Sequence, residues 1–88
     1  MPRYIIERSV PGLTPEQLDA AARRSVAVLG QMKGVRWVRS YVSAAEGKIY
    51  CEYDAPDPEA IREHARRAGL PADHISEVSM EISPAMFS

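Results

Sequence analysis

The sequence predicts an α+β domain of the ferredoxin-like class, with the element order strand–helix–strand–strand–helix–strand. Four segments alternate apolar and polar residues, two segments place apolar residues three and four positions apart, and Gly or Pro residues separate them. The expected fold is a four-stranded antiparallel sheet that carries both helices on one face. The length of 88 residues suits a single domain over residues 1–88.

The first half of the chain predicts a strand followed by a well-capped helix. Residues 4–10 form the strand, and the Pro11-Gly12 pair marks a turn. Thr14, followed three residues later by Gln17, predicts a capping box, and Pro15 suits the first helical position. Gly34 is expected to end this helix. Its apolar stripe contains Leu18, Ala21, Ala22, Ser25, Val26, Leu29 and Met32.

The middle of the chain predicts a β-hairpin of residues 35–43 and 48–54. With a turn over residues 44–47, the numbers of two residues that face each other add up to 91. This register puts opposite charges and aromatic rings across from each other on one face. The pairs expected on the face away from the helices are Tyr41–Tyr50, Arg39–Glu52 and Trp37–Asp54. The pairs expected on the helix-facing side are Val42–Ile49, Ser40–Cys51 and Val38–Tyr53.

The last third of the chain predicts a helix and a final strand. Asp57 is the expected N-cap, and Gly69 is the expected left-handed stop. The inner stripe of this helix contains Ile61, His64, Ala65 and Ala68. Residues 75–82 alternate again and predict the fourth strand, with residues 83–88 as a tail.

Composition excludes several classes of protein. The 11 Lys and Arg nearly balance the 12 Asp and Glu, so a strong electrostatic footprint for nucleic acid is absent. No apolar run approaches the roughly 20 residues of a membrane span, and we expect no membrane partner. A single Cys cannot form an internal disulfide, and no signal-peptide pattern opens the chain. We therefore expect a cytoplasmic protein.

The face of the sheet away from the helices is expected to carry Trp37, Tyr41 and Tyr50. So much aromatic area predicts a covered surface, and Trp37 and Tyr50 are the candidate residues of a homodimer interface. Base stacking is the alternative, as in RNA-recognition modules. The acidic residues expected on the same face would repel phosphate, which favours the dimer; they are Glu52, Asp54, Glu77 and Glu81.

Cys51 and His64 are the residues that suggest chemistry in the interior. The hairpin register turns Cys51 toward the helices, and the second helix turns His64 toward the sheet. A thiolate and an imidazole together could bind Ni, Zn or Cu, or form an activated nucleophile. The alternative is a small buried Cys and a hydrogen-bonded core His. Both interpretations are open at this point.

Two further groups of polar residues are weaker candidates. Asp73 and His74 share a loop and could bind a metal at the surface, although Asp is also common in turns. The four glutamates of the strands could provide acid–base chemistry, or could pair with nearby Arg and Lys residues. These glutamates are Glu7, Glu52, Glu77 and Glu81. On the second helix, Glu63 has the spacing to pair with Arg66 and Arg67.

Four segments carry the most distinctive residues of the chain: 37–42, 48–56, 61–65 and 69–75. Their most specific part is Tyr-Cys-x-Tyr-x-Ala-Pro followed by Glu-His-Ala. In these segments the chain resembles a small bacterial family of nickel-binding proteins that form ferredoxin-like dimers. The resemblance implies a cytoplasmic homodimer that binds nickel, with Cys51 and His64 as the family's characteristic polar pair and the first candidates for the ligands. We add Glu7 and His74 as further candidate ligands. Some relatives have His near positions 8 and 68, where this chain has Arg8 and Ala68.

Two other functions are compatible with the sequence. One is a dimeric α/β-barrel-type enzyme, a monooxygenase or isomerase, that binds a small organic molecule beside Ser40, Tyr41, Tyr53 and His64. The other is a non-catalytic interaction or regulatory dimer. An apolar pocket larger than a few waters next to His64 would favour the enzyme, whereas a tightly filled interior would favour the interaction dimer.

Overall fold

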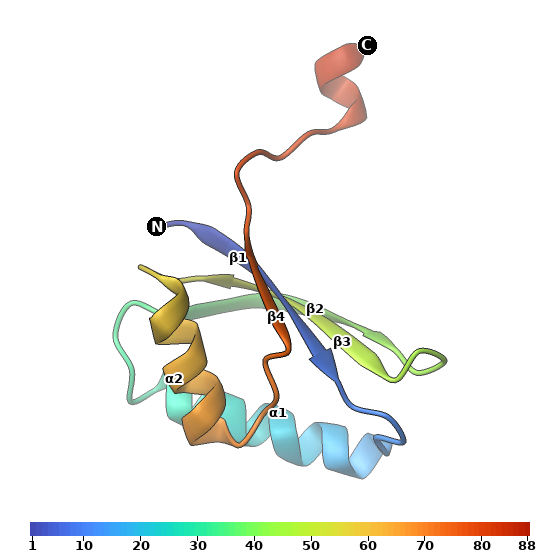
Figure 1. The fold of residues 1–88 in the computed structure, drawn as a ribbon, viewed down its shortest axis with the longest axis vertical. Coiled ribbons are helices and arrows are strands. Elements are labelled where there is room, and N and C mark those ends of the chain that lie inside the picture. The colour runs from blue at the N-terminus through green and yellow to red at the C-terminus, as the bar shows by residue number, and fades with distance from the viewer.

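The computed structural model describes all 88 residues and has the ferredoxin-like fold (Figure 1). The strand order β2-β3-β1-β4 is antiparallel throughout, and both helices lie against one face of the sheet. The predicted fold class is therefore confirmed. The elements are β1 (Arg3–Ser9), α1 (Pro15–Leu29), β2 (Arg36–Ser43), β3 (Lys48–Asp54), α2 (Pro58–Ala68), β4 (His74–Glu77) and a 3-10 helix (Pro84–Phe87).

Both helices begin at the predicted caps. The amide of Gln17 donates to Thr14 Oγ1 at 3.1 Å, and the amide of Thr14 donates to Gln17 Oε1 at 2.9 Å. Asp57 caps α2 by accepting from the amide of Ala60. The predicted stop of α1 at Gly34 is wrong, because the chain leaves the helix after Leu29 and tightens into turns with bonds between residues three apart. Neither helix is long and apolar enough to cross a membrane.

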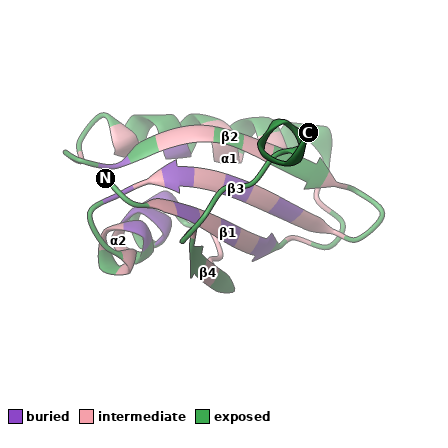
Figure 2. Ribbon diagram, turned by 90° about the horizontal axis from the view of Figure 1, so that it is seen from above, coloured by how far each residue is buried: buried purple, intermediate pink, exposed green.

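The core lies between the helices and the helix-facing side of β1 and β3. Buried residues alternate with partly exposed ones along both strands (Figure 2), as expected when one sheet face is covered. They are Tyr4, Ile6 and Arg8 on β1, and Ile49, Cys51 and Tyr53 on β3. The inner stripe of α2 is buried as predicted, with Ile61, His64, Ala65 and Ala68 each at most 3% exposed.

A β-bulge at Val38 corrects the predicted face of Trp37. The predicted register is confirmed from Ser43 back to Arg39, which lies opposite Glu52. Beyond the bulge, Trp37 lies opposite Tyr53 instead of Asp54, so the predicted pairs Trp37–Asp54 and Val38–Tyr53 are wrong. The extra residue turns the indole to the helix-facing side. Trp37 is therefore not on the open face, meaning the sheet face away from the helices, where it was expected as an interface residue.

The fourth strand is shorter than predicted. It ends at Glu77, and the amide of Val78 still donates to the carbonyl of Arg3, the first residue of β1. Glu77 lies opposite Tyr4 on the helix-facing side, so its expected place beside Glu52 on the open face is wrong, and Glu81 lies beyond the sheet. The chain then leads away from the domain (Figure 1), with four exposed apolar side chains: Met80, Ile82, Met86 and Phe87.

Candidate functional site

His64 is fully buried beneath α1. Its Nε2 lies 3.2 Å from Ser25 Oγ and 3.3 Å from the Ser25 carbonyl oxygen, and its Nδ1 has no hydrogen-bond partner. Burial lowers the pKa of His64, the hydrogen bond to the Ser25 carbonyl opposes this, and the charge of Arg8 lowers the pKa further. The imidazole is therefore neutral at physiological pH.

Tyr53 and Ser25 complete a buried polar cluster with His64. The hydroxyl oxygens of Tyr53 and Ser25 are 3.3 Å apart, and the rings of Tyr53 and His64 have centroids 5.4 Å apart. Burial is the largest cause that raises the pKa of Tyr53, so its hydroxyl stays protonated. The sequence predicted Tyr53 and His64 as neighbours. It missed Ser25, whose only signal is a polar residue within the apolar stripe of α1.

Arg8 is the largest buried side chain, at 2% exposed. Its Nη1 donates to the Pro71 carbonyl at 2.5 Å, and its guanidinium carbon lies 5.8 Å from the centroid of the Tyr53 ring. Its Nη2 is buried and has no hydrogen-bond partner. No functional role was predicted for Arg8 from the sequence, although its alternation with Tyr4 and Ile6 could have placed it on the buried face.

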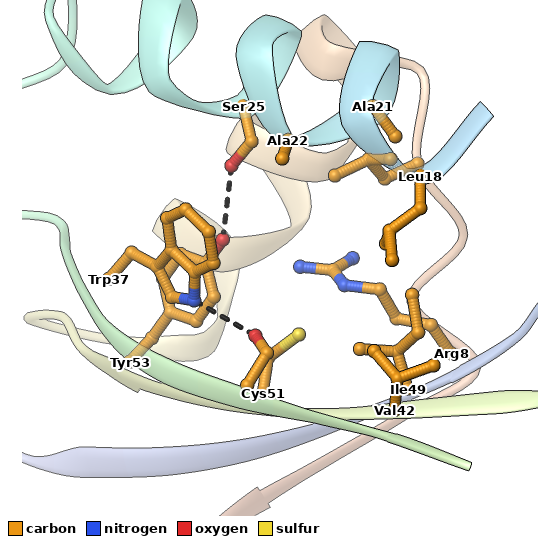
Figure 3. A pocket seen from close by; sticks show the side chains of 12 residues that line it. Arg8, Leu18, Ala21, Ala22, Ser25, Trp37, Val42, Ile49, Cys51 and Tyr53 are labelled. Atoms are coloured by element: carbon orange, nitrogen blue, oxygen red, sulfur yellow. Dashed lines mark hydrogen bonds between the residues drawn. The ribbon is translucent and has the colours of Figure 1, made fainter. Parts of the chain in front are cut away.

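A cavity of about 290 Å³ separates α1 from β2 and β3 (Figure 3). It exists because α1 presents small side chains, Ala21, Ala22 and Ser25, to the large rings of Trp37 and Tyr53. The other lining residues are Arg8, Leu18, Ser40, Val42, Ile49, Cys51 and Leu70. This volume exceeds that of a few waters, at about 30 Å³ each in the liquid, so the interior is not tightly filled. His64 does not line the cavity, which therefore differs from the pocket next to His64 that was expected for an enzyme.

The residues expected to line a pocket are divided between the two faces of the sheet. Tyr53 and Ser40 line the cavity, and Ser40 Oγ accepts a hydrogen bond from Trp37 Nε1 at 2.9 Å. Tyr41 lies opposite Tyr50 on the open face, is 55% exposed and does not line this cavity. Tyr50 lies on the open face as predicted, and its hydroxyl donates to Glu46.

The four candidate metal ligands fall into two pairs on opposite faces. Cys51 lines the cavity, and His64 lies beneath α1 on the same helix-facing side. Glu7 and His74 lie directly opposite each other on β1 and β4, on the open face. No group of three or more His, Cys, Asp or Glu residues could hold a metal ion. The side chains of one chain therefore do not make a complete metal site.

The Glu7–His74 pair lies at the edge of the sheet, close to solvent. His74 is exposed, and the Glu7 side chain is 34% exposed. Lys48 Nζ lies 3.0 Å from Glu7 Oε1. The neighbouring Asp73 is fixed by two hydrogen bonds, because its amide donates to the Glu7 carbonyl at 3.0 Å and its carboxylate accepts from the amide of Ser9 at 2.6 Å. The local backbone thus holds the pair in register.

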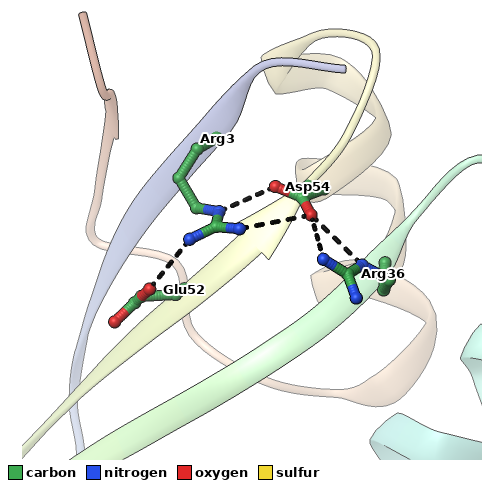
Figure 4. Close-up of polar contacts among 4 residues, drawn as sticks. All are labelled: Arg3, Arg36, Glu52 and Asp54. Carbon is green, nitrogen blue, oxygen red and sulfur yellow. Dashed lines mark hydrogen bonds and ion pairs between the residues drawn. The ribbon is translucent and has the colours of Figure 1, made fainter. Parts of the chain in front are cut away.

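One end of the open face carries a network of ion pairs (Figure 4). Arg3 contacts Asp54 at 2.7 Å and Glu52 at 3.2 Å, and Arg36 contacts Asp54 at 2.7 Å. The cation at Glu52 is therefore Arg3, although Arg39 is its cross-strand neighbour as predicted. On α2, the predicted pairs of Glu63 with Arg66 and Arg67 are confirmed. Of the four strand glutamates, Glu52 pairs with Arg3 and Glu7 with Lys48, as charge pairing would require, whereas Glu77 and Glu81 form no ion pair.

These features define a small ferredoxin-like protein with a cavity beneath α1 and a separate His–Glu pair on the open face. The family described as "Nickel responsive protein SCO4226-like" matches residues 4–78. The crystal structure of SCO4226 from Streptomyces coelicolor A3(2) is similar, with a TM-score of 0.80 and 31% sequence identity. The match covers 91% of this chain and 99% of that chain. No curated protein matches the chain. The chain belongs to the SCO4226-like family of nickel responsive proteins.

Proposed function

We propose that this protein binds Ni²⁺ or a similar divalent ion on the open face of its sheet, as part of a cellular response to nickel. Membership of a nickel responsive family supports the metal. The observation that supports the place is the direct cross-strand position of Glu7 and His74. Imidazole is a preferred ligand of Ni²⁺, and a carboxylate adds a second donor with charge compensation.

Two donors leave most of the coordination sphere to other groups. Water, or the same two residues of a second copy, would supply the remaining ligands. Lys48 now neutralises Glu7, and a bound cation would displace it, because both compete for one carboxylate. We therefore expect weak binding by a single chain.

The interior pair fits a metal ion less well. Cys51 and His64 are 5% and 0% exposed, and the cation next to them is Arg8. A divalent ion there would lose its hydration and face a buried positive charge. Cys51 and His64 nevertheless remain the alternative ligand pair, and the calorimetric comparison of variants separates the two proposals.

Calorimetry of tag-free protein with Ni²⁺ tests the proposed site. We expect saturable heat for the wild type, and roughly a tenfold or larger loss of affinity in His74→Ala and Glu7→Gln. Cys51→Ala is the matched control and should bind as the wild type does. Loss of binding in Cys51→Ala alone would move the site to the interior. No heat at millimolar Ni²⁺ would end the metal proposal.

We also propose that the protein is a cytoplasmic homodimer that binds its ligand without catalysis. The segment after β4 supports association, because Met80 and Phe87 are each 75% exposed and flank two more exposed apolar residues, Ile82 and Met86. A single buried Cys without a disulfide suits a reducing compartment.

Light scattering tests the assembly. We expect the full chain to have twice the mass of one chain, and a chain ending at Ser79 to have the monomer mass, because the last sheet contact is the bond from the Val78 amide to Arg3. A truncated chain that stays dimeric would move the interface to the sheet. A monomeric full chain would contradict the dimer.

A further inference from the structure

Arg8 is a buried cation without an anionic partner. None of the ion pairs of the molecule includes Arg8. Its guanidinium donates a hydrogen bond to the neutral Pro71 carbonyl and lies over the face of the Tyr53 ring. A guanidinium stays protonated in proteins, and a buried charge is costly unless a counter-charge and hydrogen bonds compensate it. Arg8 has no counter-charge, and its Nη2 makes no hydrogen bond, so its burial is only partly compensated.

The unpaired guanidinium reaches into the cavity beneath α1. Figure 3 shows it directed from β1 toward the rings of Trp37 and Tyr53, with Leu18 on the same side of the view as Arg8. The walls are mainly apolar, and the volume of about 290 Å³ is at the small end of the range for ligand sites. One fixed cation on an apolar wall is the arrangement that orients a small ligand with a single anionic end.

Arg8 is the one charged side chain among the residues that line the cavity. The hydroxyl groups there are neutral: Ser40 accepts a hydrogen bond from Trp37, and Ser25 contacts Tyr53 and His64. A second negative charge on the ligand would therefore have no cation to meet and would be buried unpaired. A phosphate needs several hydrogen-bond donors and cations that balance about two negative charges. A carboxylate carries one negative charge, which one guanidinium can balance. These observations favour a monocarboxylate.

We propose that the cavity is a binding site for a small organic monocarboxylate with an apolar body. The carboxylate of the ligand accepts hydrogen bonds from the free N–H groups of Arg8 Nη2. The apolar part of the ligand packs between Leu18, Val42 and Trp37. This site is separate from the proposed nickel site, because Glu7 and His74 lie on the other face of the sheet. It is thus a second ligand site, independent of the metal proposal.

A second hollow, of about 380 Å³, adjoins the cavity and provides a control residue. The two spaces share Arg8, Ala21, Ile49 and Leu70. Arg24 lines only the second one and donates to the carbonyl of Ala68 at 3.0 Å. Arg24 is therefore an arginine near the same region whose charge does not face the cavity.

Fluorescence of Trp37, the only Trp of the chain, reports on the cavity directly. Metal-free protein is titrated with sodium benzoate, and with benzyl alcohol as a probe of the same size without charge. We expect a saturable change in Trp37 emission with benzoate, and at least tenfold weaker binding of benzyl alcohol. Arg8→Met should weaken benzoate binding at least tenfold, whereas Arg24→Met and His74→Ala should leave it unchanged.

A second variant keeps the test decisive if Arg8→Met does not fold. Ala22→Leu narrows the cavity from α1 while Arg8 stays in place, and it should also abolish the benzoate response. Bound benzoate should in addition slow the reaction of Cys51, the only thiol, with a thiol reagent. Equal binding of benzoate and benzyl alcohol, unchanged binding in Ala22→Leu, or no response to benzoate would each overturn the proposal.

Discussion

Asp54 is the residue whose ionisation is most strongly tied to the fold. Hydrogen bonds from Arg3 and then Arg36 lower its pKa from the ordinary 3.8 to about 2. A carboxyl with a lowered pKa in the folded state stabilises the protein fully above the pKa of the unfolded chain. That stabilisation is lost as the pH falls from about 4 to about 2.

The variant Asp54→Asn should therefore be less stable than the wild type at pH 7. The difference should shrink steadily between pH 4 and pH 2, where the wild-type carboxyl takes up its proton and the ion pairs with Arg3 and Arg36 are lost. Urea unfolding of both proteins at pH 7, 4 and 2.5 measures it. A difference that does not change with pH would show that the amide removes packing and not charge.

The candidate site could be predicted from the sequence only in part, for reasons that lie in single residues. Alternation along β1 and β3 and the stripe of α2 were enough to bring Tyr53 and His64 together. Arg8 was missed because charged side chains are expected at the surface, so its buried position contradicts its type. Ser25 was missed because a Ser in an apolar stripe shows no partner until two elements are placed side by side.

At the scale of elements, the hairpin turn is fixed by a close contact between two loops. Gly47 has φ of 65°, its carbonyl accepts from the Val10 amide at 2.7 Å, and a Cβ on it would lie 2.9 Å from Pro11 Cα. Gly12 has φ of 73°, and a Cβ added to it would have no atom within 4 Å. The two glycines thus share a left-handed backbone and differ in the space around them.

Replacing each of these glycines by Ala separates backbone strain from collision. Gly12→Ala should cost roughly 1–2 kcal/mol of unfolding free energy, because only the left-handed conformation is strained. Gly47→Ala should cost clearly more, since the methyl group also meets the backbone of Pro11. Chemical denaturation of the two variants provides the comparison. Equal losses would mean that the turn moves away from Pro11 without penalty.

The errors in the predicted elements have physical causes in the sheet. Trp37 and Val38 are both suited to a strand interior, so either could have been the extra residue of a bulge, and alternation does not decide. The alternation of residues 75–82 continues past Glu77, but β1 begins at Arg3 and offers no further partner. Strand length is set by the neighbour as well as by the pattern.

At the scale of the whole molecule, the fold separates two kinds of chemistry. The sheet places Glu7 and His74 on one side, and Cys51, Arg8 and the cavity on the other. Element order and caps predicted the fold, because they depend on local patterns. The cavity could not be predicted, because it arises from small residues of α1 facing large ones of the sheet, which is a property of packing across elements.

Paramagnetic broadening of amide resonances, when Ni²⁺ is added to ¹⁵N-labelled protein, locates the metal relative to the two faces of the sheet. We expect the signals of Glu7, His74 and Lys48 to broaden first, because they are the proposed ligands and the side chain paired with Glu7 on the open face. Signals on the helix-facing side should broaden less, as the sheet lies between. Broadening centred on Cys51 and His64, or equal broadening throughout the chain, would contradict the proposed site on the open face.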